Sequence, residues 1–217
     1  MASKDSKSVA GVTVFVLAAV SLAALLFHAC EYLFLTDDAY ISFRYARNLA
    51  DGHGLVFNPG HERVEGYTNF LWVLLLSGFS AAGVPLEKAA HLLSLTATVG
   101  LWSLVLWFGW RLHGRSGRVL PVVAPLFLLA GTRSVAVWST SGLETRFFTL
   151  LVVAGVLRLL VESEDLARTD SSYPLAALLF ALASLTRPEA YLFCISAYAV
   201  VIVYTWRRFR IYAAWAV

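Results

Sequence analysis

Hydrophobic residues of this chain fall into long runs that short polar segments separate. Most runs are close to or longer than the ~20 residues that a helix requires to cross a bilayer. Within a bilayer, only helices and closed barrels satisfy their own backbone hydrogen bonds. The pattern therefore predicts an all-α, polytopic transmembrane bundle. The runs are residues 9–35, 89–110, 119–138, 143–161, 173–186 and 189–206, and another run begins at residue 211.

Residues 70–84 form a shorter apolar run, which the distribution of charge helps to interpret. Its about 15 residues fall below the length of a span. Basic loops of membrane proteins face the cytoplasm, and the most basic segments here are residues 111–118 and 206–210. With a cytoplasmic N-terminus, residues 111–118 reach the cytoplasm only if residues 70–84 do not cross. We therefore expect residues 70–84 to form a juxtamembrane helix within one large external loop at residues 36–88.

The composition agrees with a membrane protein and argues against a nucleic-acid partner. Hydrophobic residues make up 59% of the chain and charged residues 14%, compared with about 25% charged residues in soluble domains. The net charge is +3, but Lys and Arg are scattered through short loops. That distribution is typical of membrane topology signals rather than of a nucleic-acid surface.

The last apolar run begins at residue 211 and reaches the final residue, 217, after ~2 helical turns. Half a span cannot satisfy its backbone in lipid. We therefore expect residues 1–217 to form a single transmembrane module that is incomplete at its C-terminal end.

The longest polar stretch, residues 36–69, follows directly after the first apolar run and opens with two adjacent acids, Asp37 and Asp38. Ionisable groups at a membrane boundary are costly and often serve a function. Thr36 is predicted to cap a helix that reaches about Ala50, with both acids in its first turn. The alternative is that the acids only stabilise this helix.

Two arginines on the same predicted helix indicate a phosphate site. Arg44 and Arg47 are three residues apart and share a face with Tyr40, and planar guanidinium groups pair with phosphate oxygens. Alternatively, they anchor the helix to lipid headgroups.

His53, His61 and Glu65 of the same stretch are residue types that can bind a metal. Their spacing, however, matches no established ligand pattern. Ordinary loop residues are the better interpretation, so no metal site is assigned.

Three segments carry a resemblance to a known family. LTDDAYISFRYARNLADGHGLVFNPGHERVEGYTNFLW at residues 35–72 resembles the first extracytoplasmic loop of bacterial GT-C glycosyltransferases, which use polyprenyl-phosphate-linked sugars. WSTSGLETRFFTL at residues 138–150 resembles the S-G-L-E-T segment of these enzymes, and ALASLTRPEAYLF at residues 181–193 resembles their L-T-R-P-E segment. The three segments follow the order of the family and span most of the chain.

The resemblance implies a membrane enzyme with a GT-C-like helix bundle in the bacterial plasma membrane, part of the cell-envelope machinery. It would transfer a hexose or pentose from a polyprenyl-phosphate donor to an extracytoplasmic glycan, lipid or protein. Inversion is expected because no second nucleophile is evident. No cofactor is assigned, and a divalent metal is left open.

The resemblance also implies roles for individual residues. Asp37 corresponds to a general base and Asp38 to its support, while Arg44, Arg47 and Arg187 are the candidates for binding the donor phosphate. The residues implied to contact substrate are His53, Glu65, Tyr67, Asn69, Glu144 and Glu189.

Two other functions are consistent with parts of the pattern. A non-catalytic subunit that binds lipid phosphate or assists assembly would use the arginines and leave the acids structural. A transporter is less favoured, since transporter sites lie near the middle of the bilayer and the polar residues here cluster outside it.

Overall fold

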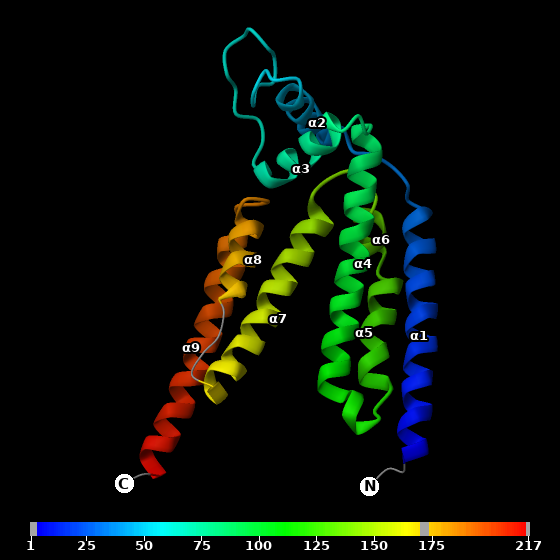
Figure 1. The fold of residues 1–217 in the computed structure, drawn as a ribbon, viewed down its shortest axis with the longest axis vertical. Coiled ribbons are helices and arrows are strands. Elements are labelled where there is room, and N and C mark those ends of the chain that lie inside the picture. The colour runs from blue at the N-terminus through cyan, green and yellow to red at the C-terminus, as the bar shows by residue number, and fades with distance from the viewer. Residues whose placement is uncertain (1–3, 170–173, 216–217) are drawn as a thin grey trace. The chain divides into compact units, whose positions relative to one another are not determined.

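The computed structural model describes residues 4–169 and 174–215, and within these ranges the chain forms helices and no strand (Figure 1). The predicted all-α class is confirmed. The chain consists of two compact units, residues 1–150 and 151–217. The helices are α1 (Lys4–Cys30), α2 (Asp37–Ala50), α3 (Phe70–Ala81), α4 (Leu86–His113), the short 3₁₀ helix η1 (Gly114–Ser116), α5 (Leu120–Gly131), α6 (Arg133–Trp138), α7 (Thr145–Thr169), α8 (Leu175–Ser184) and α9 (Ala190–Trp215).

Two helices of the described chain are long and apolar enough to cross a bilayer. They are Ser8–Cys30 within α1, with 23 residues, and Leu86–His113, which is α4, with 28 residues. The other apolar helices are shorter. The run predicted at residues 119–138 is divided into α5 and α6, because Thr132 between them has an extended backbone with ψ of 110°.

The second unit differs from the prediction in two loops. The polar loop expected from residue 162 is helical as far as Thr169, as part of α7. The break expected at the basic residues 206–210 is absent, since α9 continues through them to Trp215. Arginine is a good helix former and no Pro or Gly interrupts this segment, which explains the continuous helix.

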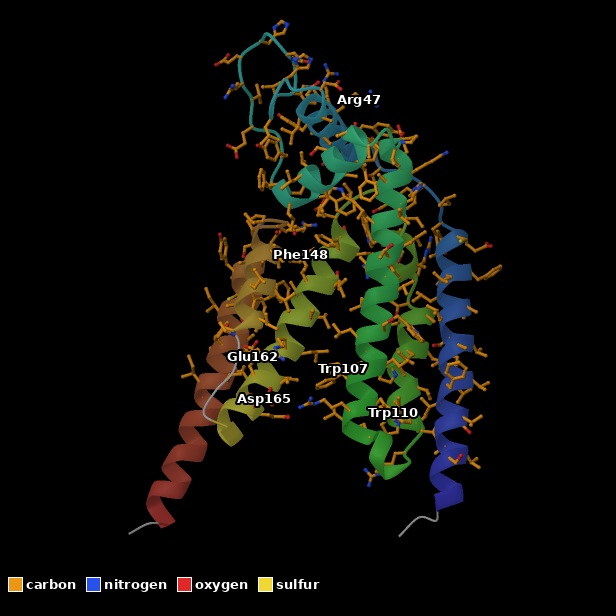
Figure 2. All side chains as sticks on the ribbon, viewed as in Figure 1. Arg47, Trp107, Trp110, Phe148, Glu162 and Asp165 are labelled. Atoms are coloured by element: carbon orange, nitrogen blue, oxygen red, sulfur yellow. The ribbon has the colours of Figure 1, made fainter. Side chains whose placement is uncertain are left out.

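A buried carboxylate links α7 to α8 in the second unit. Glu162 Oε1 accepts a hydrogen bond of 2.9 Å from Arg158 Nε and another of 2.9 Å from the backbone N–H of Ala176 (Figure 2). The second bond satisfies an N–H in the first turn of α8, which no residue of that helix can satisfy. Glu162 thus acts as a cap supplied by a neighbouring helix.

The two helices expected between residues 36 and 88 are present as α2 and α3. α3 has 12 residues and is about 18 Å long, shorter than the ~30 Å hydrocarbon core of a bilayer. Figure 1 shows α2 and α3 at the end of α1 and α4 that is far from the N-terminus, whereas η1 lies at the opposite end. The basic segment 111–118 and the N-terminus therefore share one end of the first unit. Which end faces the cytoplasm stays a prediction.

α2 is held by its apolar face. Ala39, Phe43 and Ala46 follow one another at intervals of four and three residues, so they form one stripe. The stripe is buried against Trp72 and Leu76 of α3 and against the start of α4. This packing fixes which face of α2 remains open for chemistry.

Polar contacts join α1 to its neighbours inside the apolar part of the first unit. Trp102 Nε1 donates to Ser21 Oγ over 3.1 Å, and His28 Nδ1 lies 2.9 Å from the carbonyl oxygen of Ala130. Hydrogen bonds of this kind associate helices where no water competes. They fix α1 against α4 and α5.

Gly142 allows the S-G-L-E-T segment to approach α2 closely. Its φ is +83°, and a Cβ built there would lie 2.5 Å from Leu35 Cδ2 and 3.1 Å from the Cβ of Ala39. Glycine is therefore required both by the left-handed backbone and by the space.

Gly142→Ala is expected to lower the free energy of unfolding by roughly 2 kcal/mol, because it combines left-handed strain with overpacking. Thermal unfolding in detergent measures the change. Gly78→Ala in α3 is the matched control, since nothing lies within 4 Å of its Cβ position. Equal stability of the two variants would contradict the steric requirement at Gly142.

Candidate active site at the start of α2

The first turn of α2 is tied to the S-G-L-E-T segment. The backbone N–H of Thr36 donates to the carbonyl oxygen of Ser141 over 3.0 Å, and its Oγ1 lies 3.4 Å from the same oxygen. Thr36 is the N-cap residue, but its hydroxyl caps no N–H of α2. The predicted side-chain cap is therefore wrong, because the hydroxyl faces Ser141 instead.

Asp37 and Asp38 are both exposed in the first turn of α2. They lie on different sides of the helix, because successive residues are ~100° apart. Asp37 shares the outward face with Arg44, seven residues later, while Asp38 is one turn before the buried Ser42. The first acid thus faces the open side, and the second is nearer to the packed side.

Asn69 connects the segment that precedes α3 to the S-G-L-E-T segment. Its Nδ2 donates to Glu144 Oε2 over 2.8 Å and to Ser42 Oγ over 3.0 Å. All three side chains are buried, with exposed fractions of 7% for Asn69, 7% for Glu144 and 4% for Ser42. Two of the three motifs that the sequence singled out therefore meet in one buried polar cluster behind α2.

Three buried polar atoms near this end of the first unit have no hydrogen-bond partner in the described chain: Asn69 Oδ1, Trp72 Nε1 and Arg146 Nε. Trp72 and Phe147 have ring centroids 6.1 Å apart, so α3 and the start of α7 are in contact. Buried polar groups are normally paired, and leaving one unpaired costs about 1–3 kcal/mol. Proteins often keep unpaired polar groups of this kind at sites where a ligand can pair with them.

Sequence reasoning missed Ser42 and Arg146. Ser42 had one available signal, since it follows Asp38 by four residues and so lies on the same side of the predicted helix. Arg146 lies within the quoted S-G-L-E-T segment, and its burial to an exposed fraction of 7% could not be read from its position.

Arg44 binds the loop that follows α2. Its Nε donates to the carbonyl oxygen of Phe57 and its Nη2 to Asn58 Oδ1, both over 2.6 Å. Its guanidinium carbon also lies 4.6 Å from the centroid of the Phe57 ring. These contacts give Arg44 a structural role in addition to the predicted phosphate role.

A polar hollow of about 320 Å³ lies beside Arg44 and Arg47. Arg47 (Figure 2) and Asn48 contribute from α2, and Glu87 contributes from the first turn of α4. Arg44 and Asn48 lie on the same side of α2 as Asp37, seven and eleven residues after it, whereas Arg47 lies about 80° around the helix from Asp37. The hollow therefore combines two guanidinium groups with the carboxylate of Glu87.

Tyr67 packs against α2 beneath the loop. Its ring centroid is 4.7 Å from that of Tyr45, whose hydroxyl donates to the carbonyl oxygen of Val64 over 2.6 Å. Burial raises the pKa of the Tyr67 phenol, and Glu65 and Tyr45 raise it further. The Tyr67 phenol is therefore harder to ionise than an ordinary tyrosine.

Other predicted residues of the loop are not gathered into the cluster. His53, His61 and Glu65 are exposed, and no three His, Cys, Asp or Glu side chains come together as metal ligands in the described ranges. The structure thus does not unite the three residues considered as metal ligands.

Arg187 and Glu189 form an ion pair in the second unit. Arg187 Nη2 lies 3.1 Å from Glu189 Oε1. The hydrogen bond that Arg187 donates is the main reason why the pKa of the Glu189 carboxyl is lowered. α9 begins at Ala190, so Pro188 and Glu189 precede the helix. The pair occupies the turn between α8 and α9.

Comparison with known proteins gives a sequence relative. The chain is similar to the terminal β-(1→2)-arabinofuranosyltransferase of Mycobacterium tuberculosis, with 33% identity over 188 residues. The match covers 80% of this chain and 29% of the relative, so the chain spans less than a third of the length of that enzyme. No protein-family model matches the chain, and no solved structure does. The chain is thus related in sequence to a glycosyltransferase.

Proposed function

We propose that this chain takes part in glycosyl transfer at the outer face of the bacterial plasma membrane, moving a sugar from a polyprenyl-phosphate donor to an acceptor hydroxyl. The hydrogen bond between Asn69 and Glu144 carries the proposal, because it joins two of the three motifs of the GT-C resemblance. The similarity to an arabinofuranosyltransferase supports the same class of reaction. It also makes arabinofuranose the first sugar to test.

The reaction would begin with removal of the proton of the acceptor hydroxyl by the Asp37 carboxylate. The acceptor oxygen then attacks the anomeric carbon while the bond from that carbon to the phosphate oxygen breaks, so the configuration inverts. The electron pair of the broken bond leaves with the polyprenyl phosphate. Arg44 and Arg47 beside the hollow would stabilise its charge.

The remaining candidates have supporting roles in this proposal. Asp38 would help to orient the base, and Asn69 with Glu144 would position substrate hydroxyls behind α2. Arg187, in the second unit, is a further candidate for the phosphate. The other proposed substrate contacts are His53, Glu65, Tyr67 and Glu189.

The direct test uses this chain in phospholipid vesicles with polyprenyl-phosphate-linked arabinofuranose that carries an isotopic label. The expected result is label in an added arabinan acceptor, with a linkage of inverted configuration by NMR. Release of the label to water at the same rate without acceptor would contradict transfer to an acceptor hydroxyl.

The hollow beside Arg44 and Arg47 supports a second candidate, a subunit that binds lipid phosphate without catalysis. In that case the vesicles bind the labelled donor, and Arg47→Glu abolishes binding, yet no label reaches the acceptor. Binding and transfer are measured on the same sample, so the two functions are distinguished directly.

A further inference from the structure

The polar hollow beside α2 contains one acid that the proposed reaction does not use. Glu87, in the first turn of α4, lines this hollow together with Arg44 and Arg47 of α2. In the part of the chain that the structure describes, neither Glu87 nor Arg47 forms an ion pair. Both charged groups are therefore available to a ligand that occupies the hollow.

The charges that line the hollow oppose each other. Two guanidinium groups and one carboxylate leave a net charge of +1, and the other lining residues, Tyr40, Phe43 and Asn48, are uncharged. Glu87 is half-buried and Arg47 is exposed, so water and salt weaken their interactions with a ligand without abolishing them. Each negative charge on a ligand is attracted by the arginines and repelled by Glu87. Glu87 thus reduces the preference of the hollow for highly charged anions.

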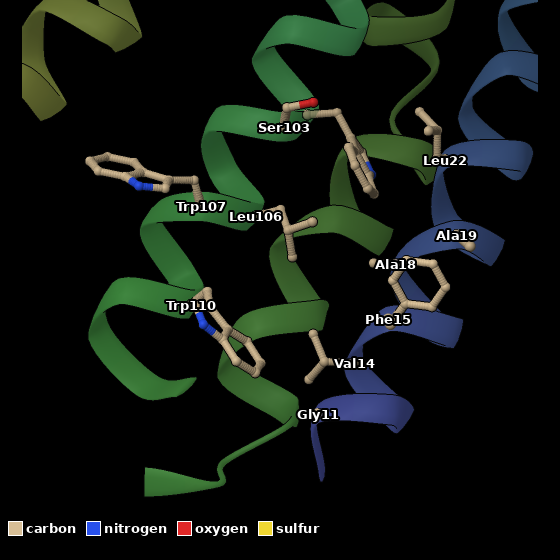
Figure 3. Close-up of a pocket in the computed structure, with 11 residues that line it drawn as sticks. Gly11, Val14, Phe15, Ala18, Ala19, Leu22, Ser103, Leu106, Trp107 and Trp110 are labelled. Atoms are coloured by element: carbon tan, nitrogen blue, oxygen red, sulfur yellow. The ribbon is translucent and has the colours of Figure 1, made fainter. Parts of the chain in front are cut away.

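A second hollow of the first unit lies between α1 and α4 and differs in its lining (Figure 3). Its residues come from positions 11–22 of α1 and 102–110 of α4, and none of these described residues is charged. A phosphate placed there would lose its water without gaining a charged partner, which is costly. Recognition of a charged headgroup is therefore assigned to the polar hollow.

The proposed reaction changes the charge of the phosphate. In the glycosyl donor, the phosphate is a diester and carries one negative charge. Transfer breaks the bond between the anomeric carbon and the phosphate oxygen, whose electron pair stays on that oxygen, while Asp37 takes the proton of the acceptor. The product is a phosphate monoester, whose second pKa is about 6. At neutral pH the product therefore carries nearly two negative charges.

We propose that Glu87 weakens the binding of spent polyprenyl phosphate in the hollow more than it weakens the binding of the glycosylated donor, because it repels the second negative charge that transfer creates. Product then leaves the hollow more readily, and fresh donor replaces it. This inference rests on the proposed function, since sugar transfer is what converts the diester into a monoester. Glu87 is a specificity-determining residue in this proposal and takes no part in the chemical step.

The test measures how tightly three lipids bind this chain in phosphatidylcholine vesicles. Polyprenyl phosphate is the monoester, and the two diesters are its methyl ester, which has no sugar, and polyprenyl-phosphate-linked arabinofuranose. Each lipid competes with labelled donor. For Glu87→Gln, we expect the affinity for the monoester, relative to that for either diester, to rise roughly fourfold over wild type, because the repulsion of nearly one additional charge is removed.

Two variants serve as matched controls. Glu87→Asp keeps the carboxylate and should keep the wild-type ratio of affinities. Glu62→Gln removes an exposed carboxylate that does not line the hollow, and it should also leave the ratio unchanged. High salt should reduce the effect of Glu87→Gln, because salt screens exposed charges. Thermal unfolding in detergent shows whether each variant is folded.

The same charge effect should appear in the transfer assay. Added polyprenyl phosphate should inhibit the Glu87→Gln variant more strongly than wild type, by roughly fourfold in the inhibition constant relative to the KM for donor. A role of Glu87 in the stability of α4 alone would change neither this ratio nor its dependence on salt.

Two results would overturn the proposal. An unchanged ratio of affinities in Glu87→Gln would limit Glu87 to the start of α4. A loss of affinity confined to the diester that carries arabinofuranose would make Glu87 a contact of the sugar instead. Failure of the proposed function has a different signature, because no label would reach the acceptor while the ratio of affinities still shifts. If Arg47→Glu leaves the binding of all three lipids unchanged, the phosphate lies outside the hollow, and the role of Glu87 is excluded as well.

Discussion

Asp37→Asn is expected to lower the rate of sugar transfer by roughly 100- to 10,000-fold, the range that a general base contributes. The amide has nearly the shape of the carboxylate but cannot accept the proton of the acceptor hydroxyl. Asp37 is exposed and lies on the same side of α2 as Arg44, two turns before it. Its substitution should leave the fold and the binding of donor unchanged. Initial rates with labelled donor, together with donor binding, measure the two effects separately.

Asp38→Asn is the matched control, because it changes the neighbouring acid on another side of the same turn. We expect a smaller fall in the rate of sugar transfer for this variant, because Asp38 is proposed to orient the base. Full transfer by the Asp37→Asn variant would exclude Asp37 as the base. A greater loss for Asp38→Asn would instead assign the base to Asp38, whose side of α2 leads to Ser42 and Asn69.

Local signals in the sequence were sufficient to predict the helices within residues 36–88. The acids at 37 and 38 mark the start of α2 at Asp37, and the apolar run after Asn69 begins α3 at Phe70. These boundaries depend on residues within a few positions of each other. The topology inferred from charge in the loops stays a prediction.

Contacts between distant positions could not be predicted in the same way. Asn69 and Glu144 are 75 positions apart, and nothing local in either segment indicates its partner. Thr132 interrupts the run at residues 119–138, where overall hydropathy predicts one span. The cap that Glu162 provides for α8 likewise depends on how two helices pack. Packing therefore decides where polar residues of apolar segments find their partners.

The Asn69–Glu144 contact is expected to be the most sensitive polar contact of the first unit. In Asn69→Asp, a carboxylate would replace the N–H donor that lies 2.8 Å from Glu144 Oε2. Two facing carboxylates in a buried place cannot both remain charged without a large cost. We expect the free energy of unfolding to fall by about 4 kcal/mol at neutral pH, as for an uncompensated buried charge. Thermal unfolding in detergent measures the loss.

The pH dependence distinguishes charge repulsion from simple loss of a hydrogen bond. In Asn69→Asp, one shared proton between the two carboxyl groups restores a hydrogen bond, so the folded state binds more protons than the unfolded state. Its stability relative to wild type should therefore rise as the pH falls from neutral to about 5. Asn69→Leu loses the same hydrogen bonds without adding a charge, and its deficit should stay constant. Parallel pH profiles for the two variants would mean that Glu144 does not face position 69, and the two motifs would no longer be joined at this site.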